Sequence, residues 1–215
     1  DLHLSIRRQR QMCIRDREDL WELWRLAAPE FTEENCPTLV YRPPVCQCQP
    51  LQIDIDLRFQ QVTEVPLNVH VRFAEKLAKK IVSIVKHSVE FYTITKDTGY
   101  YKTIKSLNKR LWANGAHLYF SNIRISKAVA RKIKSYAETI CLEFYGHLMP
   151  VNTPADIIDR AVVERANGLV VIGTFKGYKM GGRYMLRQMG SVERNGELTQ
   201  HIVERKEMFS HLKMI

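Results

Sequence analysis

Residues 51–60, Leu-Gln-Ile-Asp-Ile-Asp-Leu-Arg-Phe-Gln, alternate between apolar and polar side chains. A period of two is typical of a β-strand that buries one face, so this stretch predicts a half-buried strand with Asp54 and Asp56 on its polar face. At a rise of about 3.3 Å per residue, the two acids lie about 6 to 7 Å apart at the backbone, so their oxygens could converge on one small ion. Neighbouring carboxylates repel each other, and a divalent cation is the usual remedy. For these two residues alone, an ordinary strand with a solvated acidic face explains the pattern equally well.

The composition predicts one well-buried domain with an excess of positive charge. The chain has 215 residues, of which 45% are hydrophobic, and 33 Lys and Arg against 23 Asp and Glu give a net charge of +10. This balance favours an anionic partner such as nucleic acid or a nucleotide. The sequence shows neither an apolar run of membrane-span length nor a signal peptide, so we expect an intracellular protein without a membrane partner.

The chain is expected to divide into a basic N-terminal segment with a short helix, residues 1–30, and one main domain, residues 31–215. Trp21 and Trp24 lie in the amphipathic stretch that predicts the helix. Residues 12–17, Met-Cys-Ile-Arg-Asp-Arg, resemble a translated sequencing-adapter scar. We therefore draw no function from the arginines of about the first 17 residues.

The five cysteines indicate reduced thiols rather than a disulfide scaffold, because their number is odd and no secretory signal precedes them. Cys36, Cys46 and Cys48 cluster in a proline-rich segment, where they could hold zinc together with a nearby histidine. Their C-x9-C-x-C spacing lacks the C-x2-C pair of most zinc sites. Zinc binding at these cysteines is therefore disfavoured.

Hydrophobic periodicity and capping residues predict strands interleaved with helices, and hence an α+β fold. Ser126 is expected to cap a long helix, and Thr153 a short turn of helix that starts at Pro154. A polar, basic connector is expected between the second and third main strands, over residues 96–110. The expected strands span residues 38–41, 51–60, 88–95, 117–122 and 168–173, and the expected long helices span residues 71–87 and 127–146.

Three further positions carry residues suited to phosphate or metal chemistry. His117 begins a predicted strand on the face opposite Leu118 and Phe120, where an imidazole can bond a phosphate or a base. Asp159 follows an apolar pair and could complete a metal site from a second segment. Lys176 follows the predicted strand Gly-Leu-Val-Val-Ile-Gly, where an ammonium can neutralise a triphosphate. Taken singly, each is also explained as an incidental histidine, acid or basic turn.

In this order the acidic strand and the three further positions resemble the motifs of the archaeo-eukaryotic primase superfamily. The similarity is to the branch of primase-polymerases and primase domains of large DNA viruses. It covers roughly residues 31–190, and residues 157–176 are the most specific part in both motif and spacing. The matching stretches are Ile-Asp-Ile-Asp at 53–56, Gly-Ala-His-Leu-Tyr-Phe at 115–120, Ile-Asp-Arg-Ala-Val at 158–162 and Gly-Thr-Phe-Lys at 173–176.

The resemblance implies a catalytic core with an RRM-like mixed or antiparallel sheet and flanking helices. It implies that Asp54, Asp56 and Asp159 are the catalytic residues and bind two Mg²⁺ or Mn²⁺ ions. The expected activity is that of a DNA primase or primase-polymerase, a metal-dependent nucleotidyltransferase. It would make or extend primers on a single-stranded DNA template in viral DNA replication.

The resemblance also implies residues for the incoming nucleotide. His117 and Lys176 would bind its triphosphate, and Asn167 is a further candidate. The chain departs from the family pattern where relatives carry Lys or Ser shortly before the histidine, and where they carry a basic residue in the strand before the lysine. The additional positive charge would then come from Arg124, Lys179 or Arg183.

The expected partners are single-stranded DNA, nucleoside triphosphates and a replicative helicase, either fused or separate. The expected location is the cytoplasm or nucleus of the host cell. No Walker motif occurs before Ile215, so we expect a catalytic fragment or a stand-alone domain.

Two other functions are compatible with the sequence. One is a non-catalytic RRM-like module that grips single strands with Tyr119, Phe120 and the lysine-rich residues 102–110. A pure binder has no need of paired acids, whose negative charge would repel the phosphate backbone. The other is a different metal-dependent nucleotidyltransferase or a nuclease built on acidic strands.

Overall fold

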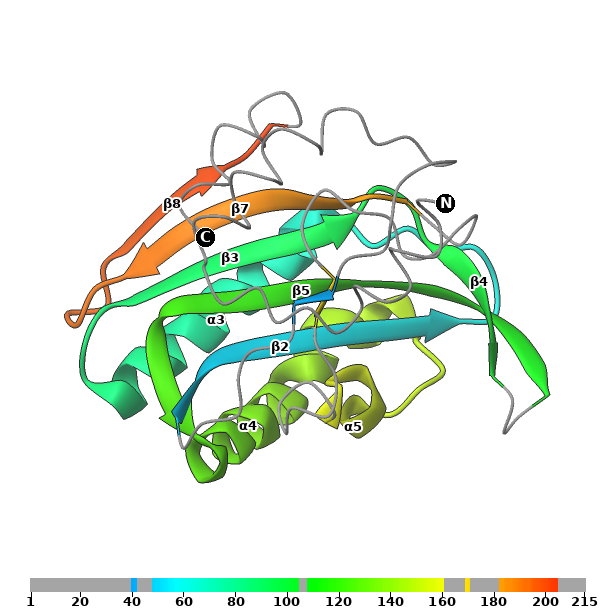
Figure 1. Ribbon diagram of the computed structural model, residues 1–215. Helices are drawn as coiled ribbons and strands as arrows, with labels where there is room; N and C mark the ends of the chain where they lie inside the picture. The colour runs from blue at the N-terminus through cyan, green and yellow to red at the C-terminus, as the bar shows by residue number, and fades with distance from the viewer. Residues whose placement is uncertain (1–39, 42–47, 105–107, 161–168, 171–181, 205–215) are drawn as a thin grey trace, which may run out of the picture.

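The computed structural model of the protein describes residues 40–41, 48–104, 108–160, 169–170 and 182–204. These residues form an antiparallel sheet with helices packed on one face (Figure 1). The strands are β1 (Val40–Tyr41), β2 (Cys48–Phe59), β3 (Val89–Lys96), β4 (Tyr100–Ile104), β5 (Lys109–Ser126), β6 (Leu169–Val170), β7 (Tyr184–Val192) and β8 (Leu198–Ile202). The helices are α3 (Leu67–Val85), α4 (Lys127–Tyr145), the 3₁₀ helix η4 (Gly146–Leu148) and α5 (Pro154–Ile157).

The main sheet has six strands in the described part of the chain. Their order is β2, β5, β3, β7 and β8, and β4 pairs with β5 beyond the end of β3. Every pairing is antiparallel. The long strand β5 therefore joins β2 on one side to β3 and β4 on the other. The predicted α+β class, with an antiparallel sheet and flanking helices, is confirmed.

The predicted alternation of residues 51–60 orients β2. Leu51, Ile53, Ile55, Leu57 and Phe59 are each at most 2% exposed and belong to the core shared with α3 and α4. Fully burying each such side chain contributes about 1.5–3 kcal/mol relative to leaving it in water. The polar residues of β2 therefore face away from the helices, as predicted.

The two long helices form close to where periodicity predicts them. In α3, Phe73, Leu77 and Ile81 are fully buried on one stripe against the sheet. In α4, the backbone N–H of Val129 donates to Ser126 Oγ at 3.4 Å, so the predicted cap is confirmed. Among the described residues, no helix is both long and apolar enough to span a membrane.

Two expectations about the strands are wrong, and two strands were missed. Residues 96–110 are not a plain connector, because β4 forms there and pairs with the start of β5. The predicted strand 117–122 is only the middle of β5, which begins at Lys109. Strands β7 and β8 were not predicted at all. The extent of β5 depends on pairing with β2 and β3, and β7 pairs with β3, so these strands are stabilised by segments distant in sequence, which local patterns do not reveal.

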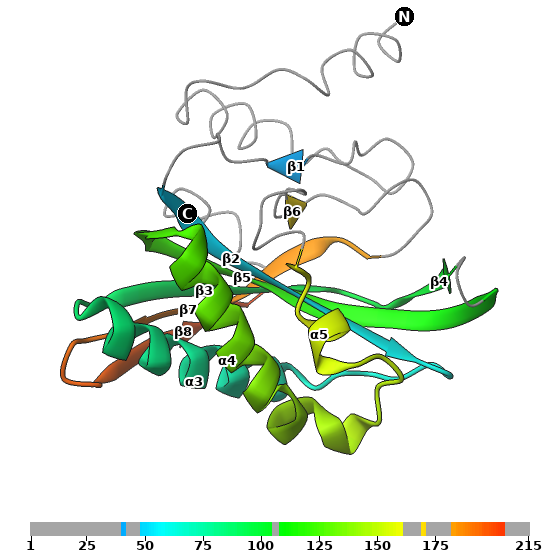
Figure 2. The same cartoon turned by 90° about the horizontal axis from the view of Figure 1, so that it is seen from below.

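The predicted strand at residues 168–173 is represented by β6, which pairs with β1. This pair lies on the side of the main sheet opposite to α3 and α4 (Figure 2). The predicted helix near Trp21, and the cysteines Cys36 and Cys46, lie outside the described residues. Whether Cys36, Cys46 and Cys48 bind zinc is therefore untested.

Candidate active site

The two acids of β2 lie on the sheet face away from the helices. The side chains of Asp54 and Asp56 are 21% and 19% exposed, so both are partly buried. Asp54 is paired with His117 and Asp56 with Gly115 in β5. The structure thus places the acidic stretch and the histidine stretch side by side on one face.

Asp159 reaches the same place through a segment that runs along the outer edge of β2. Ile158 forms an isolated antiparallel bridge with Ile55, and both are buried on the helix side. The backbone N–H of Asp159 donates to the carbonyl oxygen of Asp54 at 2.9 Å. Since neighbouring residues of an extended chain point to opposite faces, Asp159 shares the face of Asp54. The three predicted acids therefore lie on one face of the sheet, although they come from two distant segments.

Asn152 fastens this edge segment to β2. Its Nδ2 donates to the carbonyl oxygen of Asp56 at 2.7 Å, and its Oδ1 accepts from the backbone N–H of Arg58 at 3.0 Å. The backbone N–H of Val151 also donates to the carbonyl oxygen of Arg58, at 2.8 Å. The side-chain amide of Asn152 thus makes the hydrogen bonds that the backbone of a neighbouring strand would otherwise make with β2. Sequence reasoning missed this residue, and its place just before the cap Thr153 was the only local signal.

His117 is held between a carboxylate and an aromatic ring. Its Nε2 lies 3.4 Å from Asp54 Oδ1, and its side chain is 5% exposed. The ring of Tyr184, from β7, stacks on the imidazole with a centroid distance of 4.5 Å and an interplanar angle of 22°. Alternation correctly predicted that His117 faces away from the helices, but the side chain is buried rather than exposed. Sequence reasoning missed Tyr184.

Gly115 allows β5 to approach β2 beside the acids. A Cβ at this position would lie 1.8 Å from the carbonyl oxygen of Ile55, which no real side chain tolerates. The close approach of the two backbones therefore requires glycine here. In the resulting register, Asp54 lies opposite His117 and Asp56 lies opposite Gly115.

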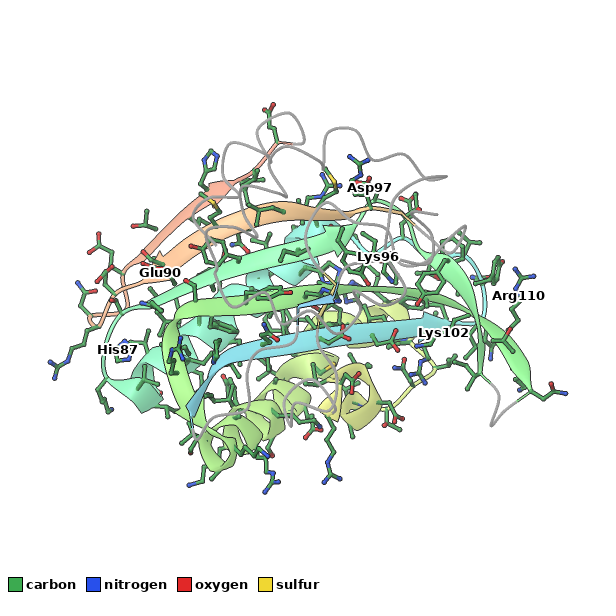
Figure 3. The ribbon with its side chains drawn as sticks, in the orientation of Figure 1. His87, Glu90, Lys96, Asp97, Lys102 and Arg110 are labelled. Carbon is green, nitrogen blue, oxygen red and sulfur yellow. The ribbon has the colours of Figure 1, made fainter. Side chains whose placement is uncertain are left out.

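Asp56 is neutralised by two cations. Its Oδ2 accepts from Arg58 Nη2 at 3.0 Å and Nε at 3.3 Å, and from Lys102 Nζ at 3.0 Å. Burial would raise the pKa of Asp56, but the charges of Lys102 and Arg58 outweigh that effect and hold the pKa below its ordinary value. Lys102 reaches this site from β4 (Figure 3). Sequence reasoning placed it in the connector and missed its contact with Asp56.

A further lysine lies above the aromatic rings of the site. Lys96 Nζ is 4.1 Å from the ring centroid of Tyr100 and 5.4 Å from that of Tyr184. Burial, and next the negative charge of Asp54, raise the pKa of Tyr184 well above its ordinary value. The phenol is therefore neutral at physiological pH. Lys96 and Lys102 (both labelled in Figure 3), together with Arg58, place three cations close to the acids.

Not every predicted nucleotide ligand lies beside the acids. Arg124 is exposed and pairs with Pro50, four residues along β2 from Asp54. At about 3.3 Å per residue this is roughly 13 Å along the strand. Asn167 and Lys176 lie outside the described residues.

Three carboxylates, two from β2 and one from the edge segment, are oxygen ligands of the kind that Mg²⁺ and Mn²⁺ prefer. The side chains are not gathered into a finished cage, however. Within the described residues, no three His, Cys, Asp or Glu side chains are close enough to hold a metal together. The Oδ2 of Asp56 is engaged by Lys102 and Arg58 instead.

Comparison with known protein families supports the predicted resemblance. The family model of the C962R protein N-terminal AEP domain matches residues 2–189, a span that contains all four motif stretches. No curated protein matches the chain significantly. The matched domains are primase-type domains of viral DNA replication. The chain therefore belongs to this archaeo-eukaryotic primase family of large DNA viruses.

Proposed function

We propose that the protein is the catalytic domain of a DNA primase or primase-polymerase that joins nucleotides on a single-stranded DNA template. One observation carries the proposal: Asp54, Asp56 and Asp159 come from two distant segments and lie on one sheet face beside His117. A fold needs no such concentration of negative charge. A nucleotidyl transfer site does need it, to hold divalent ions at the reacting phosphate.

In this proposal the three acids would hold two Mg²⁺ or Mn²⁺ ions. Such ions make attack of a 3′-hydroxyl on an α-phosphate easier and offset the charge of the leaving pyrophosphate. His117 would donate a hydrogen bond to the triphosphate from its fixed position beside Asp54. Lys176 and Asn167 would contact the same group. The position of Arg124, far along β5, favours a contact with the nucleic acid strand instead.

The hairpin of β4 and β5 supports single-stranded DNA as the partner. Residues 100–112 contain four Lys and Arg residues and no acid. Tyr101 is 42% exposed, the guanidinium of Arg110 lies 4.8 Å from its ring centroid, and Trp112 packs against its edge. Exposed rings among cations are typical of surfaces that stack bases and bind phosphates. This hairpin extends from the acidic site, to which Lys102 joins it.

Primer synthesis on single-stranded DNA tests the proposal. The assay supplies labelled nucleotides and Mg²⁺ or Mn²⁺, and compares the parent with Asp54→Ala, Asp56→Ala and the double variant. Glu143→Gln is the control, because it removes an exposed carboxylate on α4, away from the site. Template-dependent product should appear with the parent and the control, and should be lost with the double variant. Full synthesis by a folded double variant would refute the assignment.

A second candidate is a non-catalytic single-strand binder, favoured by the same hairpin. It predicts salt-sensitive DNA binding that neither divalent metal nor nucleotide alters. The primer-synthesis assay also identifies a different metal-dependent nucleotidyltransferase or a nuclease. Degradation of the DNA indicates a nuclease, and untemplated tailing indicates a terminal transferase.

A further inference from the structure

Asp56 has two cationic partners on one carboxylate oxygen. Arg58 and Lys102 both lie within 3.0 Å of its Oδ2. Their side chains are 23% and 33% exposed, against 19% for Asp56. The three charges are thus largely withdrawn from water, where an ion pair is screened less than at the surface. A divalent ion that uses this oxygen must compete with both cations.

The two partners are attached very differently. Arg58 is on the same strand as Asp56, and its backbone is clamped by hydrogen bonds from Val151 and Asn152. Lys102 belongs to β4, which in the described residues pairs with β5 alone. Its ammonium is a single charge at the end of a flexible stem. Lys102 makes a single contact with Asp56 Oδ2, whereas Arg58 donates to the same oxygen from both Nη2 and Nε, so Lys102 is the partner whose departure breaks fewer bonds.

An ammonium released from Asp56 needs another anion. The triphosphate that accompanies a divalent ion supplies one, because phosphate oxygens accept hydrogen bonds from Lys readily. Metal and nucleotide together would then replace one ion pair by two favourable contacts. Metal alone would break the pair and leave Lys102 without compensation.

We propose that Lys102 is a placeholder cation that neutralises Asp56 and moves to the triphosphate when metal and nucleotide bind. The inference rests on the proposed function, since it takes Asp56 as a metal ligand. It has a quantitative consequence. Metal alone binds weakly, and metal and nucleoside triphosphate strengthen each other's binding by the same factor.

Binding of Mn²⁺ to the full chain, measured by the electron paramagnetic resonance of free Mn²⁺, tests this role. The measurement is made without DNA, with and without a non-hydrolysable nucleoside triphosphate, and the Mn²⁺ bound by the nucleotide in the absence of protein is subtracted. Lys102→Met should bind Mn²⁺ alone about fivefold more tightly than the parent, the size expected for loss of a partly buried ion pair. The strengthening of Mn²⁺ binding by nucleotide should shrink by a similar factor. Lys102→Arg, which keeps a cation, should retain the weak binding of Mn²⁺ alone.

Lys109→Met is the matched control, because it removes the same charge from an exposed position of the same hairpin. It should leave Mn²⁺ binding as in the parent. Equal tightening by Lys109→Met would show that overall charge, and not the contact with Asp56, sets the affinity. Unchanged or weaker Mn²⁺ binding by Lys102→Met would overturn the proposal, provided that circular dichroism shows a folded protein.

Asp56→Asn separates this proposal from the proposed function. If it abolishes Mn²⁺ binding while Lys102→Met binds as the parent does, only the placeholder role fails. If Asp56→Asn binds Mn²⁺ as the parent does, Asp56 is not a metal ligand, and both proposals fail at this residue. Both fail too if the parent binds no Mn²⁺ even with nucleotide.

Discussion

The backbone N–H of Asp159 donates a hydrogen bond to the carbonyl oxygen of Asp54 at 2.9 Å. This bond joins the two segments that supply the acids of the site. The bridge between Ile55 and Ile158 adjoins it, and both side chains are buried on the helix side. Asp159 is therefore directed to the polar face by the packing of its neighbour, and its position depends on how firmly the edge segment is held to β2.

Asn152→Ala should loosen that segment. The substitution removes one donor and one acceptor bonded to the backbone of β2. At about 0.5–1.5 kcal/mol for each hydrogen bond, the free energy of unfolding should fall by about 1–3 kcal/mol. Primer synthesis should fall even under conditions in which the variant remains folded, because Asp159 loses its fixed position. Urea unfolding and the synthesis assay measure the two effects, with Asn68→Ala, an exposed residue of the first turn of α3, as the control. Equal behaviour of the two variants would contradict the role of Asn152.

Gly115→Ala should be poorly tolerated although it adds a single methyl group. That methyl would lie 1.8 Å from the carbonyl oxygen of Ile55, so β5 and β2 must separate beside the acids. We expect a loss of stability on the order of 3 kcal/mol, at the upper end for overpacking. Gly146→Ala is the matched control, because its methyl would meet only Leu142 at 3.8 Å in ordinary contact. Thermal unfolding of the two variants should differ by many degrees, and similar melting temperatures would argue against the close approach.

Tyr184 should act through its ring rather than its hydroxyl. Tyr184→Phe keeps the surface that stacks on His117, so the KM for nucleotide should change little. Tyr184→Leu removes the aromatic contact, worth about 0.5–1.5 kcal/mol, and should raise that KM several-fold through a loosened imidazole. Steady-state kinetics together with the NMR signals of the His117 ring would check this. A rise in KM with the Phe variant as large as with the Leu variant would assign the role to the hydroxyl instead.

Acid should destabilise the protein through His70 before it reaches the carboxylates. Burial lowers the pKa of His70 to about 4 from 6.5, and its Nδ1 is hydrogen-bonded to the hydroxyl of Tyr145 at 2.9 Å. Between pH 6.5 and about pH 4, His70 is therefore protonated in the unfolded chain and neutral in the folded chain. Stability from this residue is complete above pH 6.5 and is lost as the pH falls towards 4. Between pH 7 and pH 5, the free energy of unfolding should fall by about 2 kcal/mol because of this residue.

His70→Leu removes the titrating group and tests this linkage. Chemical unfolding gives the free energy of unfolding at pH 7 and pH 5. The decrease between these two pH values should be about 2 kcal/mol smaller in the variant than in the parent. The comparison is made within each protein, so a general change of stability in the variant does not affect it. The same pH dependence in both proteins would show that another group titrates in this range.

Features that depend on near neighbours along the chain could be predicted from the sequence alone. Alternation in residues 51–60 placed the apolar side chains of β2 on the core and Asp54 and Asp56 on the opposite face, and both predictions are confirmed. The caps Ser126 and Thr153 marked the starts of α4 and α5 correctly. These features follow from backbone geometry and hydrogen bonds within a few residues, so they can be read from local patterns.

The contacts between distant residues depend on the three-dimensional arrangement of the strands. The contact of Lys102 with Asp56 requires β4 to pair with β5, and the stacking of Tyr184 on His117 requires β7 to lie beside β3. Asn152 and Asp159 reach β2 because the edge of that strand offers backbone groups for hydrogen bonding. Pairing between distant strands depends on the order and register of the whole sheet. No local periodicity encodes that order, so the acids and His117 could be predicted from the sequence, whereas Lys102, Tyr184 and Asn152 could not.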